Sequence, residues 1–256
     1  MNRHIRPAFA AVVTLSLLAA GCGGRGDASL GRTVEITTPP PTATGATQSR
    51  FPFVAKAIVP QLAVYNAPED SQADRVLDNP WVLDPAYPDQ TVPQVFLVKE
   101  QRADGWVRVL LPIRPNGSTG WVRATDVSLT PNPFRVTVEL GAHRITVTND
   151  QTVLYQGDIA IGTGDTPTPT GAYFVRVKIR AIDPTTVYGP YAWGLSSHSD
   201  VLETFNGGDG EIGIHGNNDA SVLGRDVTHG CVRMDNDAIT TLTNTITLGT
   251  PVDIVA

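Results

Sequence analysis

Residues 212–217 read Ile-Gly-Ile-His-Gly-Asn, and residues 228–234 read Thr-His-Gly-Cys-Val-Arg-Met. The second stretch holds Cys231, one of two cysteines in a chain of 256 residues. A thiol becomes a strong nucleophile when a neighbouring base takes its proton or a positive charge offsets it. His215 and His229 are the two candidates for that base. Together the two stretches predict a cysteine-based catalytic site.

The spacing of the two histidines gives them different expected roles. His229 lies two residues before Cys231, so in an extended segment both side chains point to the same side. His215 lies sixteen residues before Cys231 on a predicted strand, and it can reach the thiol from a neighbouring strand. We therefore expect His215 to act as the base and His229 to shape the site.

Glycines accompany both reactive residues. Gly216 follows His215 and Gly230 precedes Cys231. Glycine adopts backbone conformations closed to other residues and lets N–H groups point at a developing oxyanion. We expect the N–H of Cys231, together with that of Gly230, to form an oxyanion hole.

A group must also hold the His215 ring in one orientation. No carboxylate stands at an obvious triad spacing, so a backbone carbonyl can serve as the acceptor for the far ring nitrogen. Asp209, Asp219 and Asp226 are alternatives, although each is typical of a solvated turn.

These motifs resemble the signature of the L,D-transpeptidases with a YkuD-type catalytic domain. The resemblance covers about residues 134–256 and includes Gly162-Thr163-Gly164 and Thr168-Pro169-Thr170-Gly171. It implies Cys231 as nucleophile, His215 as acid/base, the Gly216 carbonyl as the orienter of His215, and His229 and Gly230 as the oxyanion segment. Thr228 stands where serine is commoner, and the exchange keeps a hydroxyl.

The resemblance also implies a reaction. Cys231 would attack the carbonyl of the third residue of a peptidoglycan tetrapeptide stem, release D-alanine and form a thioester. A diaminopimelate amine of a neighbouring stem would then open the thioester and create a 3→3 crosslink, without a cofactor. Water as acceptor would make the protein an L,D-carboxypeptidase, and the acceptor is left open.

Three further residues are candidates for substrate binding. Arg233 matches a substrate-side arginine of this branch, and its guanidinium can hold the anionic donor stem; an ion pair with Asp235 is the alternative. Tyr191 and Trp193 could line the donor groove, although such aromatic residues are more often packed in a core.

The first 50 residues indicate export. Residues 1–21 have an arginine-containing start, an apolar run too short to span a bilayer, and small residues before Cys22, as in a lipoprotein signal with lipidation of Cys22. Residues 22–50 are rich in Gly, Thr and Pro and predict a disordered tether. We expect a lipid-anchored protein on the outer face of a bacterial cell membrane; plain secretion is the alternative.

Charge and cysteine usage narrow the partners. The net charge is −6, and removal of residues 1–21 takes away two arginines, which makes it −8. A chain this acidic does not fit binding to nucleic acid. With Cys22 acylated, Cys231 has no partner for an internal disulfide. We expect a monomer whose partners are peptidoglycan stem peptides and, through lipid, the membrane.

Two mainly β domains are expected after the tether. Short alternating segments broken by turns predict a small barrel over residues 51–130, and its repeated Gly-Trp-Val-Arg at 105–108 and 120–123 resembles bacterial SH3-like domains. Whether that domain binds ligand or only spaces the enzyme is left open. Residues 131–256 are expected to form the β-rich catalytic domain, with one or two short helices and a helix over 235–243 capped by Asp235.

Three other functions compete with transpeptidation. A zinc site could use His215, His229 and Cys231, although no paired Cys or His-x-x-x-His spacing supports it, and we expect no metal. A papain-like wall peptidase would place cysteine before histidine, the reverse of the order here. A non-catalytic peptidoglycan-binding lipoprotein would have no use for an intact His215–Cys231 pair.

Overall fold

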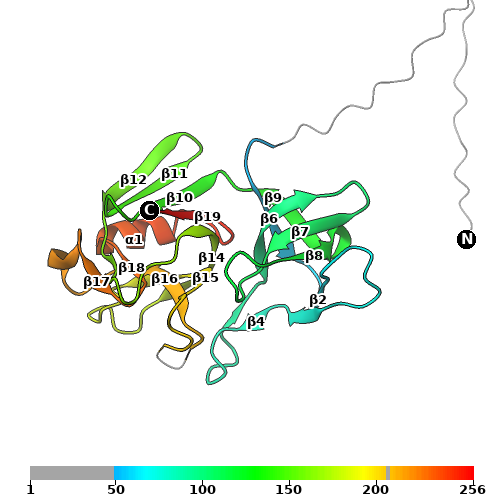
Figure 1. The fold of residues 1–256 in the computed structure, drawn as a ribbon, viewed down its shortest axis with the longest axis horizontal. Helices are drawn as coiled ribbons and strands as arrows, with labels where there is room; N and C mark the ends of the chain where they lie inside the picture. Colours follow the sequence, from blue (N-terminus) through cyan, green and yellow to red (C-terminus); the bar gives the residue numbers. More distant parts are fainter. Residues whose placement is uncertain (1–48, 206–207) are drawn as a thin grey trace, which may run out of the picture. The chain divides into compact units, whose positions relative to one another are not determined.

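The computed structural model describes residues 49–205 and 208–256 (Figure 1). The predicted signal peptide, Cys22 and all of the tether before residue 49 lie outside the described residues. Within the described ranges, no helix combines the length and the apolar character that crossing a bilayer requires.

The N-terminal part is a five-stranded antiparallel sheet with two small hairpins beside it. The order of the large sheet is β8-β7-β6-β1-β9. Its strands are β1 (Phe53–Ala57), β6 (Val95–Gln101), β7 (Trp106–Leu110), β8 (Thr119–Arg123) and β9 (Val127–Pro131). The hairpins pair β2 (Gln61–Val64) with β3 (Arg75–Asp78), and β4 (Trp81–Val82) with β5 (Thr91–Val92). A 3₁₀ turn at Ala124–Asp126 precedes β9.

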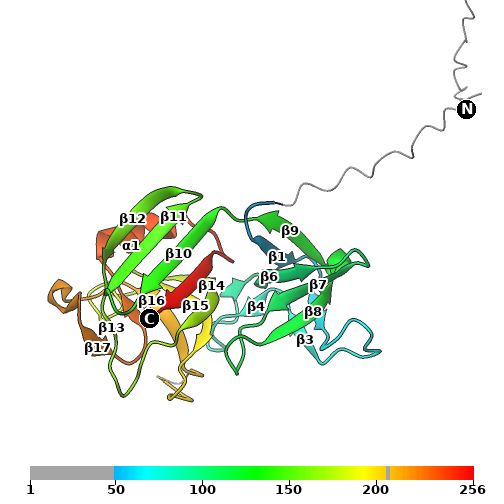
Figure 2. The ribbon, with the colours of Figure 1, turned by 45° about the horizontal axis from the view of Figure 1, so that its top comes forward.

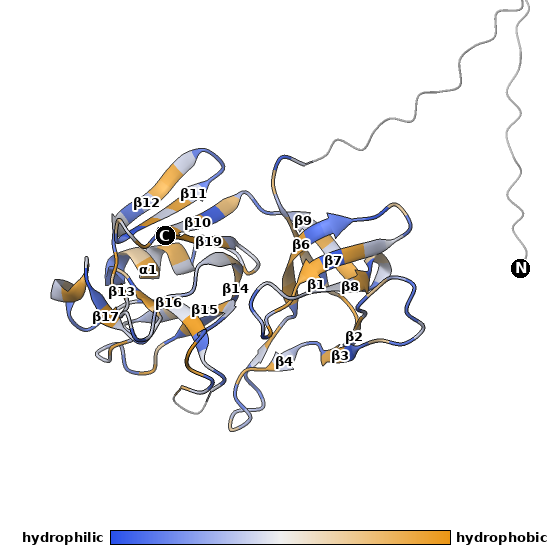
Figure 3. Cartoon of the chain, in the orientation of Figure 1, coloured by the Kyte–Doolittle hydropathy of each residue, from blue (hydrophilic) through white to orange (hydrophobic). Residues whose placement is uncertain are grey.

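Alternation of apolar and polar residues explains this sheet. In β8 the burial pattern alternates, with Gly120 and Val122 inside, as expected when one face of a strand packs on a core. Figure 3 shows hydrophobic and hydrophilic residues together on the strands of this sheet. Gly105 allows the turn between β6 and β7, since its φ of +87° lies in the left-handed region.

The C-terminal part is built on an eight-stranded mixed sheet of order β12-β11-β10-β19-β14-β15-β16-β18 (Figure 2). Its strands are β10 (Phe134–Glu139), β11 (Arg144–Asn149), β12 (Thr152–Asp158), β14 (Gly171–Arg180), β15 (Tyr191–His198), β16 (Glu211–His215), β18 (Val232–Arg233) and β19 (Pro251–Val255). A separate parallel pair joins β13 (Ile161–Gly162) to β17 (Asp226–Thr228). A 3₁₀ turn covers Ala220–Val222.

One α-helix, α1 (Asn236–Thr243), packs against this sheet. Asp235 caps it by accepting a hydrogen bond from the Ala238 N–H at 2.9 Å, which confirms the predicted cap. The apolar side chains of α1 join a core that includes Val136, Val175 and Ile214. The prediction of a mainly β protein with one or two short helices is confirmed.

The N-terminal sheet and the C-terminal sheet pack against each other. The Phe174 ring on β14 lies 6.5 Å from the Phe96 ring on β6 and belongs to the core of the N-terminal sheet. Buried Asn132 donates to the Thr250 hydroxyl at 3.3 Å. These contacts hold the N-terminal sheet against the C-terminal one independently of the cysteine site.

Candidate active site

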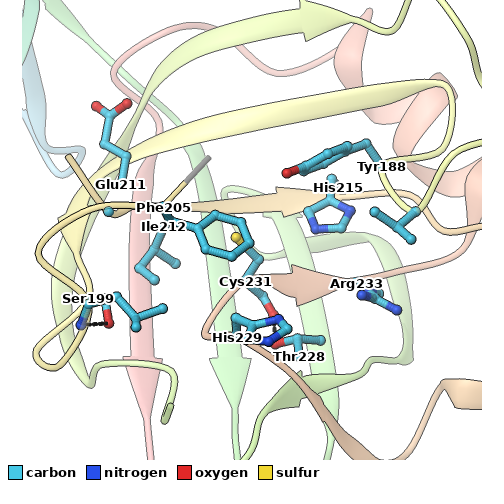
Figure 4. A pocket seen from close by; sticks show the side chains of 13 residues that line it. Tyr188, Ser199, Phe205, Glu211, Ile212, His215, Thr228, His229, Cys231 and Arg233 are labelled. Carbon is cyan, nitrogen blue, oxygen red and sulfur yellow. Dashed lines mark hydrogen bonds between the residues drawn. The ribbon is translucent and has the colours of Figure 1, made fainter. Parts of the chain in front are cut away.

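The reactive residues meet where β16 and β18 run side by side. These strands pair in parallel, with Ile214 opposite Val232 and His215 opposite Arg233. Cys231 immediately precedes β18, so its side chain and that of His215 line one cavity of about 240 Å³ (Figure 4). As predicted, His215 lies on a strand, β16, that neighbours the strand following Cys231.

The Cys231 thiol is protonated at rest. Burial raises its pKa above the ordinary value, while a hydrogen bond from the Gly213 N–H and the positive charge of Arg233 act in the opposite direction. The Gly213 nitrogen lies 3.4 Å from Cys231 Sγ. Because the thiol is neutral, a base must remove its proton as it attacks.

His215 is neutral at rest and is built to be that base. Its side chain is almost fully buried, and burial lowers its pKa to about 4; the positive charge of Arg233 acts in the same direction, whereas the Gly216 and Val187 carbonyls favour the protonated ring and oppose this. Nδ1 lies 2.7 Å from the Gly216 carbonyl oxygen, so Nδ1 carries the proton and donates. That tautomer leaves Nε2 as the nitrogen that can accept a proton.

The three aspartates considered for orienting His215 bond to other residues instead. Asp209 lies 3.1 Å from His198, Asp219 caps the short turn at Ser221, and Asp226 lies 2.6 Å from His143. The Gly216 backbone carbonyl therefore holds the ring, which is the orienter expected from the sequence ahead of the three aspartates.

The turn before Cys231 is shaped by Thr228. The buried Thr228 hydroxyl donates to the Cys231 carbonyl at 2.6 Å and accepts from the Gly230 N–H at 3.1 Å. This corrects one expectation, because the Gly230 N–H is already bonded and is not turned toward an oxyanion. The Cys231 N–H stays the predicted donor of the oxyanion hole.

Gly230 is required for its backbone rather than for its N–H. Its φ is +117°, which side-chain-bearing residues rarely adopt, and an added Cβ would lie 2.9 Å from Ile212 Cδ1. The buried Thr168 hydroxyl donates to the Gly230 carbonyl at 2.8 Å and accepts from the Gly162 N–H at 2.9 Å. Sequence reasoning gave Thr168 no individual role, although it lies in the quoted Thr-Pro-Thr-Gly motif.

Aromatic rings form much of the cavity wall around the reacting pair. The His229 ring lies 5.5 Å from Phe205, and the Tyr188 ring lies 5.0 Å from His215. Figure 4 shows these side chains, with Ile212, around the Cys231 sulfur. His229 thus lines the cavity, as predicted. Tyr188 and Phe205 were missed, because nothing in their local sequence distinguishes them from packing residues.

The three predicted substrate-binding residues, Arg233, Tyr191 and Trp193, lie in different surroundings. Arg233 lines the cavity, and its charge acts on both Cys231 and His215. Among the described residues no ion pair joins it to Asp235, and its buried Nε has no hydrogen-bond partner. Tyr191 lines a neighbouring cavity of about 460 Å³.

Trp193 does not fit the predicted role in substrate binding. Its side chain is fully buried, and Nε1 donates to the Thr243 hydroxyl on α1 at 2.8 Å. The strand alternation of β15 turns this side chain into the core, so the indole has no exposed surface, although the residue borders a second cavity that His215 and Cys231 also line.

The geometry does not place a metal centre among the reactive residues. Within residues 49–205 and 208–256, no group of three or more His, Cys, Asp and Glu side chains is arranged to hold a metal ion. What the site offers instead is a neutral thiol, a neutral imidazole and a nearby guanidinium, the groups needed for acyl transfer through a thioester.

Comparison with known proteins identifies the family. Residues 133–254 match the YkuD family, described as the L,D-transpeptidase catalytic domain. "Putative L,D-transpeptidase YkuD" of Bacillus subtilis is 30% identical over 122 residues, which cover 48% of this chain and 66% of the relative, just under two thirds of its length. "Putative L,D-transpeptidase YqjB" of the same species is 32% identical over 133 residues, covering 48% of this chain and 71% of the relative.

A solved structure gives a more distant likeness. An L,D-transpeptidase from Mycobacterium tuberculosis is 18% identical, covers 78% of this chain and 80% of its own, and superposes with a TM-score of 0.43. The family match over residues 133–254 and the relative with 32% identity lead to one conclusion: the chain belongs to the L,D-transpeptidase family and carries a YkuD-type catalytic domain.

Proposed function

We propose that this protein is an L,D-transpeptidase that forms 3→3 crosslinks between peptidoglycan stem peptides. The observation that carries the proposal is that Cys231 and His215 line the same cavity, where the His215 imidazole is buried and neutral and is held through Nδ1 by the Gly216 carbonyl. The family to which the chain belongs supports the choice of substrate.

Acylation consumes the donor stem. As Cys231 Sγ bonds to the carbonyl carbon of the third stem residue, its proton passes to His215 Nε2. The carbonyl oxygen becomes an oxyanion, which the Cys231 N–H can stabilise. When the intermediate collapses, the carbon–nitrogen bond to D-alanine breaks, and His215 returns the proton to the departing amine. The products are a thioester on Cys231 and free D-alanine.

Deacylation completes the crosslink. A diaminopimelate amine of a second stem attacks the thioester carbonyl, and His215 takes a proton from that nitrogen. The carbon–sulfur bond then breaks, and the proton passes to the sulfur, which restores the thiol. No cofactor enters either step, because the thioester retains the free energy of the broken peptide bond.

Arg233 supplies the charge that matches this substrate. Its guanidinium lines the cavity and lacks a carboxylate partner within the described residues, so it can hold a carboxylate of the anionic donor stem. The same charge lowers the pKa of Cys231, which aids loss of the thiol proton.

The experiment incubates the purified full-length protein with tetrapeptide stems and follows the products by mass spectrometry. We expect a joined product and one D-alanine for each crosslink with the wild type, and neither with Cys231→Ala. His215→Asn should also be inactive, because an amide cannot accept and return the proton while it can still donate to the Gly216 carbonyl.

Other outcomes identify the alternatives. Tripeptide and D-alanine without any joined product would make the protein an L,D-carboxypeptidase. Unchanged products with Cys231→Ala would remove the cysteine from the mechanism. Stem binding without turnover by the wild type would favour a non-catalytic peptidoglycan-binding lipoprotein.

We also propose that the enzyme acts as a monomer outside the cytoplasm, held to the outer face of the cell membrane by lipid on Cys22. The support is the sequence of residues 1–22 and the tether after it. The N-terminal sheet, with its repeated Gly-Trp-Val-Arg, is proposed to be an SH3-like domain. Cys22→Ser should release the protein from the membrane fraction, and retention there would contradict the anchor.

A further inference from the structure

The described part of the loop between β15 and β16, residues 199–205 and 208–210, contributes to one wall of the cysteine cavity. Ser199, Leu202 and Phe205 from this loop, with Gly210 at its end, line the cavity that holds Cys231. Figure 4 shows Phe205 and Ser199 among the side chains that line this cavity. Substrate bound in the cavity would therefore lie against these residues.

The N-terminal sheet holds this loop through an arginine on the hairpin between β7 and β8. Arg114 Nη1 donates to the Ser199 carbonyl at 2.5 Å, and Nη2 donates to the Leu202 carbonyl at 2.8 Å and to the Asp209 carbonyl at 2.9 Å. One guanidinium thus joins both ends of the loop. A planar group with five donors suits this arrangement, because its geometry is fixed.

A second residue of the same hairpin secures the start of the loop. Asn116 Nδ2 donates to the His198 carbonyl at 2.7 Å, and Asn116 Oδ1 accepts from the His198 N–H at 2.9 Å. The side-chain amide therefore pairs with His198 as a neighbouring strand would. It fixes the last residue of β15, from which the loop departs.

The loop is shaped to receive the guanidinium. Gly210 has a φ of +76°, and an added Cβ would lie 2.3 Å from the Leu202 carbonyl oxygen and 2.9 Å from Arg114 Nη2. A side chain at this position would therefore push the loop away from Arg114. Arg114 and Gly210 come from different halves of the chain, and the absence of a side chain at Gly210 leaves room for the Arg114 guanidinium.

We infer that Arg114 and Asn116 are positioning residues for substrate binding, through which the N-terminal sheet sets the wall of the cysteine cavity. The inference rests on the proposed function. Contacts that join the two sheets elsewhere, such as Phe96 with Phe174, do not reach the cavity wall. The two hairpin residues thus do more than hold the sheets together.

The test compares Arg114→Met with Arg75→Met in the full-length protein. Arg75 also lies on the N-terminal part and pairs with Asp74, but it does not touch the loop. With tetrapeptide stems, Arg114→Met should raise KM about three- to tenfold, because its three charge-assisted hydrogen bonds are lost from a partly exposed site that acts on substrate only through the loop, and it should change kcat less than about twofold. Arg114→Lys should lie between Arg114→Met and the wild type, and Arg75→Met should match the wild type.

A second readout does not depend on transpeptidation. The rate at which iodoacetamide alkylates Cys231 is followed by mass spectrometry of the tryptic peptide 226–233, which separates this thiol from Cys22. If the loop wall is loosened, Arg114→Met should alkylate faster than the wild type and Arg75→Met should not. Asn116→Ala repeats both measurements in case Arg114→Met does not fold.

The outcomes separate the two proposals. An active wild type with unchanged KM and alkylation rate in both Arg114→Met and Asn116→Ala would overturn the positioning role and leave the proposed function intact. If the wild type does not turn over stems but Cys231 is alkylated faster in Arg114→Met than in the wild type, the proposed function would be overturned and the positioning role supported. Equal changes in Arg75→Met would also overturn the inference.

Discussion

Acidification should destabilise the folded protein through His215. In the unfolded chain this imidazole takes up a proton near its ordinary pKa of 6.5, whereas burial holds its folded pKa at about 4. Between these two values the unfolded state binds the proton and the folded state does not. The free energy of unfolding therefore falls as the pH drops from 6.5, and this contribution levels off below about 4.

The size of the effect follows from the two pKa values. Each tenfold change in proton concentration within the window is worth about 1.4 kcal/mol when one state is protonated and the other is not. The contribution of His215 therefore totals about 3 kcal/mol between pH 6.5 and 4. This is a large part of the net stability of an ordinary domain, which is roughly 5–15 kcal/mol.

The assay measures urea unfolding at pH 7, 5.5 and 4 for the wild type and for His215→Asn. The asparagine can keep the hydrogen bond to the Gly216 carbonyl but does not titrate. The other titratable groups are present in both proteins, so their effects cancel in the difference. We expect the wild type to lose about 3 kcal/mol more than the variant over this range.

Two results would refute this reasoning. Parallel loss of stability in both proteins would mean that His215 titrates alike in the folded and unfolded states. A folded-state NMR titration of the His215 ring with a midpoint near 6.5 would give the same answer directly. The acid limb of kcat/KM offers a further check, since it should fall near pH 4 if neutral His215 is the base.

Two substitutions test the surroundings of the pair. Thr228→Val keeps the shape but removes the bonds to the Cys231 carbonyl and the Gly230 N–H, so it should cost about 1–3 kcal/mol of stability and lower kcat at least about tenfold; an unchanged kcat would mean that Thr228 does not position the thiol. Trp193→Phe should cost about 1–3 kcal/mol in urea unfolding, because it loses the bond to Thr243, with KM changed less than about twofold. A large rise in KM with unchanged stability would restore Trp193 as a substrate contact.

The fold was predictable where local patterning decides it. The apolar segment at 95–98 and the segments at 106–111 and 173–179 became β6, β7 and β14, because short runs rich in apolar and β-branched residues form strands that bury side chains in a core. The cap of α1 at Asp235 was predictable because capping involves only neighbours in the sequence. The order of the eight-stranded sheet was not, since it depends on pairing between distant segments such as β10 and β19.

In the candidate active site, too, some residues were predictable from the sequence and others were not. Cys231 and His215 stood out because their residue types and flanking glycines carry chemistry in any context. Trp193 was assigned to substrate because an aromatic residue in sequence does not reveal which face of its strand is buried. The Gly230 N–H was assigned to the oxyanion hole because its bond to Thr228 becomes visible only when the turn is closed.

The amino-acid sequence by itself determined which atoms can react: a thiol, an imidazole and a guanidinium near the end of the chain. Only the tertiary structure decided their protonation states and orientation: both reactive groups are neutral, and His215 is held by the Gly216 carbonyl. It also decided that Arg114, 117 residues before Cys231, holds the cavity wall. The physical reason is that burial and hydrogen bonding arise from which distant segments meet, whereas the chemistry of a side chain is present before the chain folds.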